Sequence, residues 1–122
     1  MRIQIIPFIL KVPKIKMKII RQNILPPKGF LAINLFGYLF CKPNAKITDV
    51  TINHEQIHTE QMKEMLYVPF YLLYGIEWLI KLFCKGNAYR NISFEREAYD
   101  NQYNLDYIKT RKHYSWLKRL FK

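Results

Sequence analysis

Two histidines at positions i and i+4, with a glutamate between them, are the residues in this sequence whose types and spacing indicate chemistry. They are His54 and His58, and Glu55 directly follows the first of them. The surrounding residues predict a helix, in which side chains four positions apart lie on the same face. Two neutral imidazoles placed in this way can bind one zinc ion, and the adjacent carboxylate can act as a general base. A catalytic zinc needs a third protein ligand, which must come from elsewhere in the chain.

Four residues outside this pattern are the weaker candidates for the third ligand. Glu60 and Glu64 lie on the same predicted helix as the histidines but outside their stripe, so we expect both on a solvated face. Glu77 is a lone acid in an apolar helix, where it can be the buried partner of an arginine or lysine. His113 lies in a basic, exposed tail. We therefore expect none of the four to bind the metal.

Glu95 and Glu97 lie on a separate predicted helix and are the remaining candidates. Side chains two positions apart on a helix diverge by about 200°, so only one of the two can face the histidines comfortably. In a second interpretation both carboxylates pair with Arg96 or nearby lysines on a solvated face, and the two histidines are ordinary core or surface residues. The residues alone leave these choices open.

The two patterns together resemble those of the gluzincin metallopeptidases, in which HExxH is followed downstream by a helix bearing ExxA. The similarity is greatest to the minimal gluzincins and the prenyl-protease-like branch, where the second pattern reads ExxAD. The matching residues are Glu95, Ala98 and Tyr99, and the resemblance covers residues 51–99. It implies a zincin-like minimal core with Glu95 as the third zinc ligand and Ala98 as the small residue between two helices. Tyr99 replaces the family's aspartate, which supports a ligand histidine, so that support is missing from the pattern.

This resemblance implies a zinc-dependent metallopeptidase that cleaves a peptide or protein substrate. We expect Glu55 to take a proton from the attacking water and to deliver it to the leaving amine. An oxyanion stabiliser is also needed, and the sequence offers three tyrosine hydroxyls without choosing among them: Tyr89, Tyr99 and Tyr103. The alternative is a catalytically inactive zincin-like domain that acts as a membrane-surface or protein-binding module.

The length and composition predict one α+β domain that spans residues 1–122. The chain has 122 residues, of which 50% are hydrophobic, enough for a modest core. Alternation over residues 14–19 and the apolar run 30–40 predict a small N-terminal antiparallel sheet. Three to four helices are expected to follow. The first is capped by Thr48 or Thr51 and ended by Pro69, and another is capped by Asn91 or Ser93.

Two further segments bear on partners. The stretch 66–84 is nearly continuously apolar apart from Glu77, which favours a buried or membrane-surface helix over a span. Residues 107–122 predict a basic amphipathic helix that contains Trp116, and such helices bind anionic membrane surfaces. The alternative is that Trp116 and Leu120 pack on the core.

The charge and the cysteines complete these expectations. The formal net charge of +11 favours anionic partners, but no nucleic-acid-binding motif is present, so we expect no nucleic acid partner. Cys41 and Cys84 lack CxxC spacing and are expected to be free thiols. With no secretory signal expected, these features predict a cytoplasmic protein that associates with the membrane surface.

Overall fold

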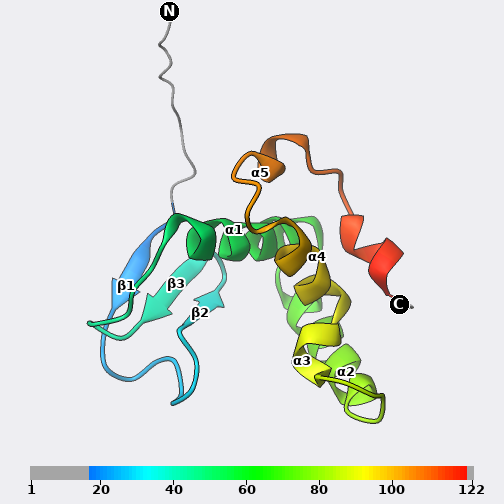
Figure 1. Ribbon diagram of the computed structural model, residues 1–122, viewed down its shortest axis with the longest axis horizontal. Helices are drawn as coiled ribbons and strands as arrows, with labels where there is room; N and C mark the ends of the chain where they lie inside the picture. Colours follow the sequence, from blue (N-terminus) through cyan, green and yellow to red (C-terminus); the bar gives the residue numbers. More distant parts are fainter. Residues whose placement is uncertain (1–16, 121–122) are drawn as a thin grey trace, which may run out of the picture.

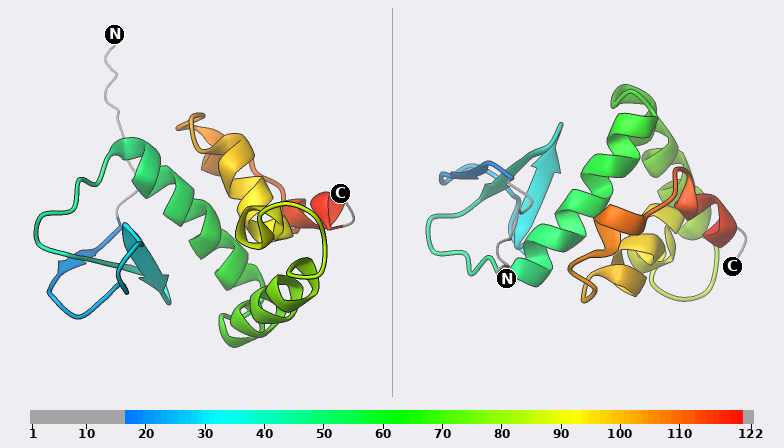
Figure 2. Two further views of the ribbon diagram at one scale, coloured as in Figure 1. Left: turned by 60° about the horizontal axis from the view of Figure 1, so that its bottom comes forward. Right: turned by 90° about the horizontal axis from the view of Figure 1, so that it is seen from above.

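The computed structural model describes residues 17–120, which form the α+β fold that the sequence predicts. Helix α1 lies between a small sheet and the remaining helices, so it contacts both layers (Figures 1 and 2). The elements are, in chain order, β1 (Ile19–Arg21), β2 (Ala32–Leu35), β3 (Tyr38–Cys41), α1 (Asp49–Glu64), α2 (Val68–Lys81), α3 (Ala88–Asn91), α4 (Ser93–Asn101), α5 (Tyr107–Thr110) and a 3-10 helix, η1 (Ser115–Arg119).

The sheet is mixed, with strand order β1-β3-β2. Strands β2 and β3 form the predicted antiparallel pair, joined by a tight turn in which Phe36 and Gly37 both have positive φ. Strand β1 differs from the expectation because it pairs parallel to β3. The loop after β1 carries the chain past β3, so β1 and β2 lie on opposite sides of that strand. Half of the strand predicted over residues 14–19 lies outside the described residues, and of the other half only Ile19 belongs to β1.

Helix α1 begins at its predicted cap, but it ends at Glu64 and not at Pro69 as expected. The side chain of Thr48 accepts a hydrogen bond from the amide of Thr51, and the Thr51 side chain caps the Thr48 amide in return. At the other end, Leu66 and Tyr67 have φ values of 57° and 67°, which turn the chain sharply into α2. Pro69 lies in the first turn of α2, where its missing amide hydrogen costs nothing.

Glu77 of α2 caps the beginning of α4. Its Oε2 accepts from the amide of Ser93 at 2.7 Å, and its Oε1 accepts from the Ser93 hydroxyl at 2.6 Å. The carboxylate thus lies at the positive end of the α4 dipole. Helix α4 has no side-chain cap from its own N-cap residue. The expected pairing of Glu77 with an arginine or lysine is therefore wrong. The expected cap by Asn91 or Ser93 is also wrong, because the N-cap of α4 is Ile92. Residues 88–91 form the short helix α3, which is capped by Asn87.

The C-terminal segment is not the continuous amphipathic helix that its composition predicts. Helix α5 ends at Thr110, after which Arg111 is extended and Tyr114 adopts a left-handed conformation. Because the helix stops before Arg111, this side chain can reach the buried carboxylates of Glu64 and Glu97. Trp116 is buried, with its ring centre 4.5 Å from that of Phe94, so this segment packs on the core.

The core lies where α1, α2, α4 and η1 meet, around Met62, Phe70, Ile92, Phe94 and Trp116. Both cysteines are free, as expected: Cys41, at the end of β3, is buried, and Cys84, after α2, is exposed. Among residues 17–120, no helix is both long enough and apolar enough to cross a membrane.

Candidate metal centre

Three buried side chains from two helices converge on one point. The Nε2 atoms of His54 and His58, one turn apart on α1, each lie 3.1 Å from Oε1 of Glu95 on α4. One ligand atom from each of the three residues lies within 4.8 Å of the others, and all three residues are buried. The i, i+4 spacing in α1 and the packing of α1 against α4 therefore bring together three residues singled out in the sequence.

The other ring nitrogen of each histidine contacts a glutamine oxygen. Nδ1 of His54 lies 2.7 Å from Oε1 of Gln102, and Nδ1 of His58 lies 2.8 Å from Oε1 of Gln61. Because an amide oxygen only accepts, each Nδ1 carries the hydrogen and each Nε2 of a neutral ring offers its lone pair to the centre. Sequence analysis missed both glutamines. Gln61 follows His58 by three positions, a spacing that could have identified it.

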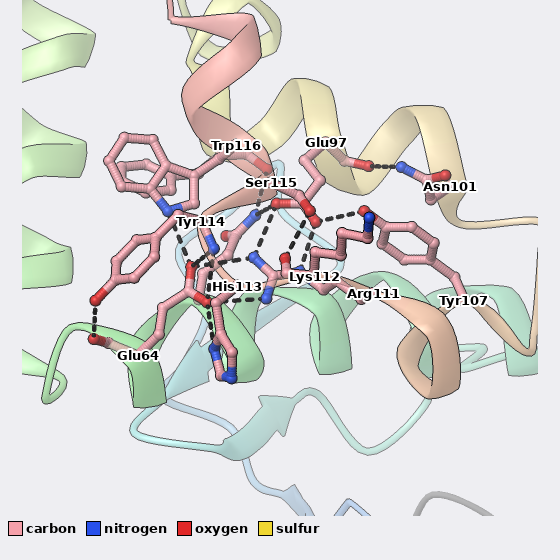
Figure 3. A network of polar contacts seen from close by, with 12 residues as sticks. Glu64, Glu97, Asn101, Tyr107, Arg111, Lys112, His113, Tyr114, Ser115 and Trp116 are labelled. Atoms are coloured by element: carbon pink, nitrogen blue, oxygen red, sulfur yellow. Dashed lines mark hydrogen bonds and ion pairs between the residues drawn. The ribbon is translucent and has the colours of Figure 1, made fainter.

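Glu97 fixes the orientation of Gln61 and takes no part in the centre. The side-chain amide of Gln61 donates to Oε1 of Glu97 at 2.9 Å and to the carbonyl oxygen of Phe94 at 3.1 Å. Both are acceptors, so the Gln61 oxygen must face His58. Glu97 itself is fully buried and forms an ion pair with Arg111 (Figure 3). Glu97 is therefore not placed as the runner-up metal ligand. It supports His58 indirectly, through Gln61.

Glu64 belongs to this same network rather than to a solvated face. Its side chain is 2% exposed and accepts two hydrogen bonds from Arg111, at 3.0 and 3.1 Å, and one from the Trp116 indole at 3.0 Å (Figure 3). The expectation of a solvated Glu64 is wrong because its partners lie about fifty positions later in the chain. Glu60 conforms to that expectation and pairs with Lys63 at the surface, while His113 is exposed beside Glu64.

In the absence of a cation, a proton on His58 pairs this ring with the Glu95 carboxylate. Burial opposes protonation of His58, but the Glu95 carboxylate outweighs it and raises the pKa of His58 to about 9. Burial likewise favours the neutral form of Glu95, yet His58 and His54 hold the pKa of Glu95 well below its ordinary value. The centre therefore strongly favours a positive charge between the imidazoles and the carboxylate.

A cavity of about 400 Å³ opens beside this centre and is lined by Glu55, His58 and Glu95. Burial raises the pKa of Glu55, an effect that the neighbouring histidines reduce but do not cancel. A carboxylate with a raised pKa in a cavity has the properties of a general base. The remaining walls come from the loop before β2, from β2, and from α1, α2 and α3, and they are mostly apolar and aromatic.

Three tyrosines lie near the centre, and the candidate Tyr103 does not. Tyr89 lines the cavity, and burial raises its pKa, so its hydroxyl stays protonated. The ring of Tyr99 packs edge-on against the His54 ring, with the centres 4.6 Å apart. Tyr103, which the sequence offered as an oxyanion stabiliser, is 77% exposed and is not part of the cavity wall. Tyr74, which sequence analysis missed within the apolar helix, donates to Oε2 of Glu95 at 2.6 Å.

The donor set fits a metal ion. Two imidazole nitrogens and one carboxylate oxygen are the ligands of one class of catalytic zinc sites, which keep a fourth position for water or substrate. Two atoms bound to one tetrahedral zinc at about 2.0–2.1 Å lie about 3.4 Å apart. The 3.1 Å separations between each Nε2 and Oε1 of Glu95 need an outward shift of only a few tenths of an ångström. Gln61 and Gln102 hold both rings in the required tautomer.

Comparison with protein-family models, with curated proteins and with solved structures finds no match to this chain.

Proposed function

We propose that this protein is a zinc-dependent peptidase, with His54, His58 and Glu95 as the metal ligands. One observation carries the proposal: the two Nε2 lone pairs converge on a carboxylate oxygen at the wall of a cavity that also contains Glu55. This arrangement supports the gluzincin-like interpretation of the sequence. The missing aspartate at position 99 is offset, because Gln102 supports His54 in its place.

Zinc held by these ligands supplies a Lewis acid that lowers the pKa of water towards about 7 and polarises a carbonyl group. Glu55 takes a proton from the attacking water and passes it to the amine that leaves when the peptide bond breaks. Burial raises the pKa of Glu55, which favours its acceptance of the proton from water. Tyr89 is the tyrosine best placed to donate to an oxyanion, because it lines the cavity and stays protonated. The apolar walls favour a substrate with apolar side chains next to the cleaved bond.

Metal content and hydrolysis measured on matched variants test this proposal. Glu55→Gln is expected to bind one zinc per chain and to cleave no peptide of a mixed-sequence library that the wild-type protein cleaves. Glu60→Gln is the control, since this glutamate lies on the same helix but pairs with Lys63 at the surface. Equal cleavage by Glu55→Gln and wild type would refute the role of Glu55. A purified protein that neither contains nor takes up zinc would refute the metal centre.

A second candidate is a non-enzymatic domain in which the metal only stabilises the fold. The ligands come from two different helices, so a metal bound to them would join α1 and α4 in the core, which favours this candidate. It predicts that zinc raises the unfolding temperature, and that neither wild type nor any variant hydrolyses peptides. Cleavage by wild type, lost in Glu55→Gln, would exclude it.

A further inference from the structure

Helix α2 turns large apolar side chains outwards along most of its length. We call this group the α2 surface. Its members are exposed to between 42% and 92%: Leu72, Leu73, Ile76, Leu79, Ile80 and Phe83, the last just beyond the end of the helix. Soluble domains rarely expose so many neighbouring apolar groups unless the surface binds a partner.

The opposite side of α2 is held by contacts within the fold. Phe70 lies in the core, Tyr74 donates to the metal-centre carboxylate, and Glu77 caps α4. These three residues recur at intervals of four and three, so they form one stripe that faces inwards. Rotation of α2 to bury the exposed leucines would break all three contacts. The α2 surface is therefore a stable outward face of the part of the chain that the structure describes, and it is available to a partner.

The charges next to this surface identify the partner. Between residues 65 and 94 the only acidic residue is Glu77, which is buried against Ser93. The cations at the end of α2 and in the following segment are Lys81, Lys85 and Arg90, of which the last two are exposed. An apolar helical face bordered by cations and free of exposed carboxylates matches an anionic bilayer surface.

We propose that the α2 surface docks on an anionic lipid bilayer with α2 lying in the plane of the membrane. The 14 residues of α2 span about 21 Å, whereas the hydrocarbon core of a bilayer is about 30 Å thick. The helix therefore lies on the bilayer with its apolar side chains in the boundary between headgroups and acyl chains. This inference depends on exposure and charge alone and is independent of the proposed peptidase activity.

Co-sedimentation of the full-length chain with vesicles tests the apolar contact. Wild type is expected to bind vesicles of equal parts phosphatidylcholine and phosphatidylserine. Leu72→Gln combined with Leu79→Gln is expected to weaken binding about tenfold or more, because both leucines lose their apolar contact with lipid. Glutamine retains good helix propensity, so the fold is preserved at these exposed positions, which circular dichroism checks. The matched control is Leu105→Gln with Leu117→Gln, two exposed leucines on other segments, which is expected to bind as wild type does.

The charge contribution has its own pair of variants. Lys81→Gln with Lys85→Gln is expected to weaken binding about fivefold for each lysine near the surface. Lys112→Gln with Lys118→Gln removes the same charge from other exposed positions and is expected to have a smaller effect. Binding by wild type should fade with added salt and be weak on phosphatidylcholine alone.

Brominated phosphatidylcholine in the same anionic vesicles identifies the contacting face directly. Trp116 is buried, and Trp78 lies two positions from Ile76 and therefore on nearly the opposite side of α2, so lipid bromine should quench the fluorescence of Trp78→Phe combined with Ile76→Trp. Absence of binding at low salt, or equal binding by both leucine pairs, would overturn the proposal. A dimer in solution that only Leu72→Gln with Leu79→Gln dissociates, together with absence of vesicle binding, would show instead that a second copy covers the α2 surface.

Discussion

Gln102, at the C-terminal end of α4, holds its Oε1 2.7 Å from Nδ1 of His54 on α1. This contact fixes the tautomer of His54, a candidate metal ligand. Gln102 itself lies outside the HExxH and ExxA patterns. We predict that Gln102→Met, which removes the acceptor and keeps the volume, lowers zinc affinity about ten- to a hundredfold. Competition with a chromophoric chelator measures the change.

Tyr99→Phe is the matched control for this prediction. The ring of Tyr99 packs on the His54 ring, and phenylalanine preserves that packing while losing only the hydroxyl. Zinc affinity should therefore stay within about twofold of wild type, well inside the range expected when support for a ligand is lost. A larger loss for Tyr99→Phe than for Gln102→Met would show that tyrosine, and not glutamine, supports His54.

Tyr74→Phe should destabilise the metal-free protein. The Tyr74 hydroxyl donates to the buried Glu95 carboxylate at 2.6 Å, and a hydrogen bond to a charged group contributes about 1.5–3 kcal/mol. The free energy of unfolding in urea should fall by about this amount. Tyr103→Phe, at an exposed position, should leave both stability and any hydrolysis unchanged.

The stability of the chelator-treated protein should depend on pH through His58. The folded-state pKa of His58 is about 9 against an ordinary value of 6.5, so its stabilising effect is complete below pH 6.5 and is lost as the pH rises through 9. The loss amounts to up to about 3 kcal/mol. Bound zinc requires deprotonated histidine, so stabilisation by saturating zinc should instead grow over the same range. Urea titrations at several pH values test both trends, and an unchanged slope in His58→Gln would contradict this origin.

Arg111→Met should be among the most destabilising single changes in the described part of the chain. The Arg111 guanidinium forms ion pairs with both Glu64 and Glu97, and removal of one partner from a buried ion pair costs about 3–5 kcal/mol. Arg119→Met is the control, because its partner Asp100 is mostly exposed and such pairs contribute about 1 kcal/mol or less. Equal effects of the two substitutions on urea unfolding would show that the network in Figure 3 contributes little.

Local patterns in the sequence predicted what short-range geometry controls. The i, i+4 spacing of His54 and His58 was sufficient to place both rings on one face, and the Thr48 cap defined the start of α1. The choice between Glu95 and Glu97 could not be made from helix geometry, which shows only that the two diverge. It depends on which side of α4 packs against α1.

Residues whose partners lie far along the chain could not be placed from sequence. Glu64 has the pattern of a surface residue because its neighbours on α1 do not reveal Arg111, which comes 47 positions later. The C-terminal segment has the composition of an amphipathic helix, yet buried ion pairs with Arg111 outweigh its helix propensity. Tertiary contacts overrode local preference in both places.

Helix α2 holds α4 at two points, through Tyr74 on Glu95 and Glu77 on Ser93. A displacement of α2 by a bound surface would therefore pull on the carboxylate that faces the two imidazoles. Thermodynamic reciprocity then demands that lipid and metal change each other's affinity by the same factor. If α2 docks without moving, that factor is one, and the two binding events are energetically separate.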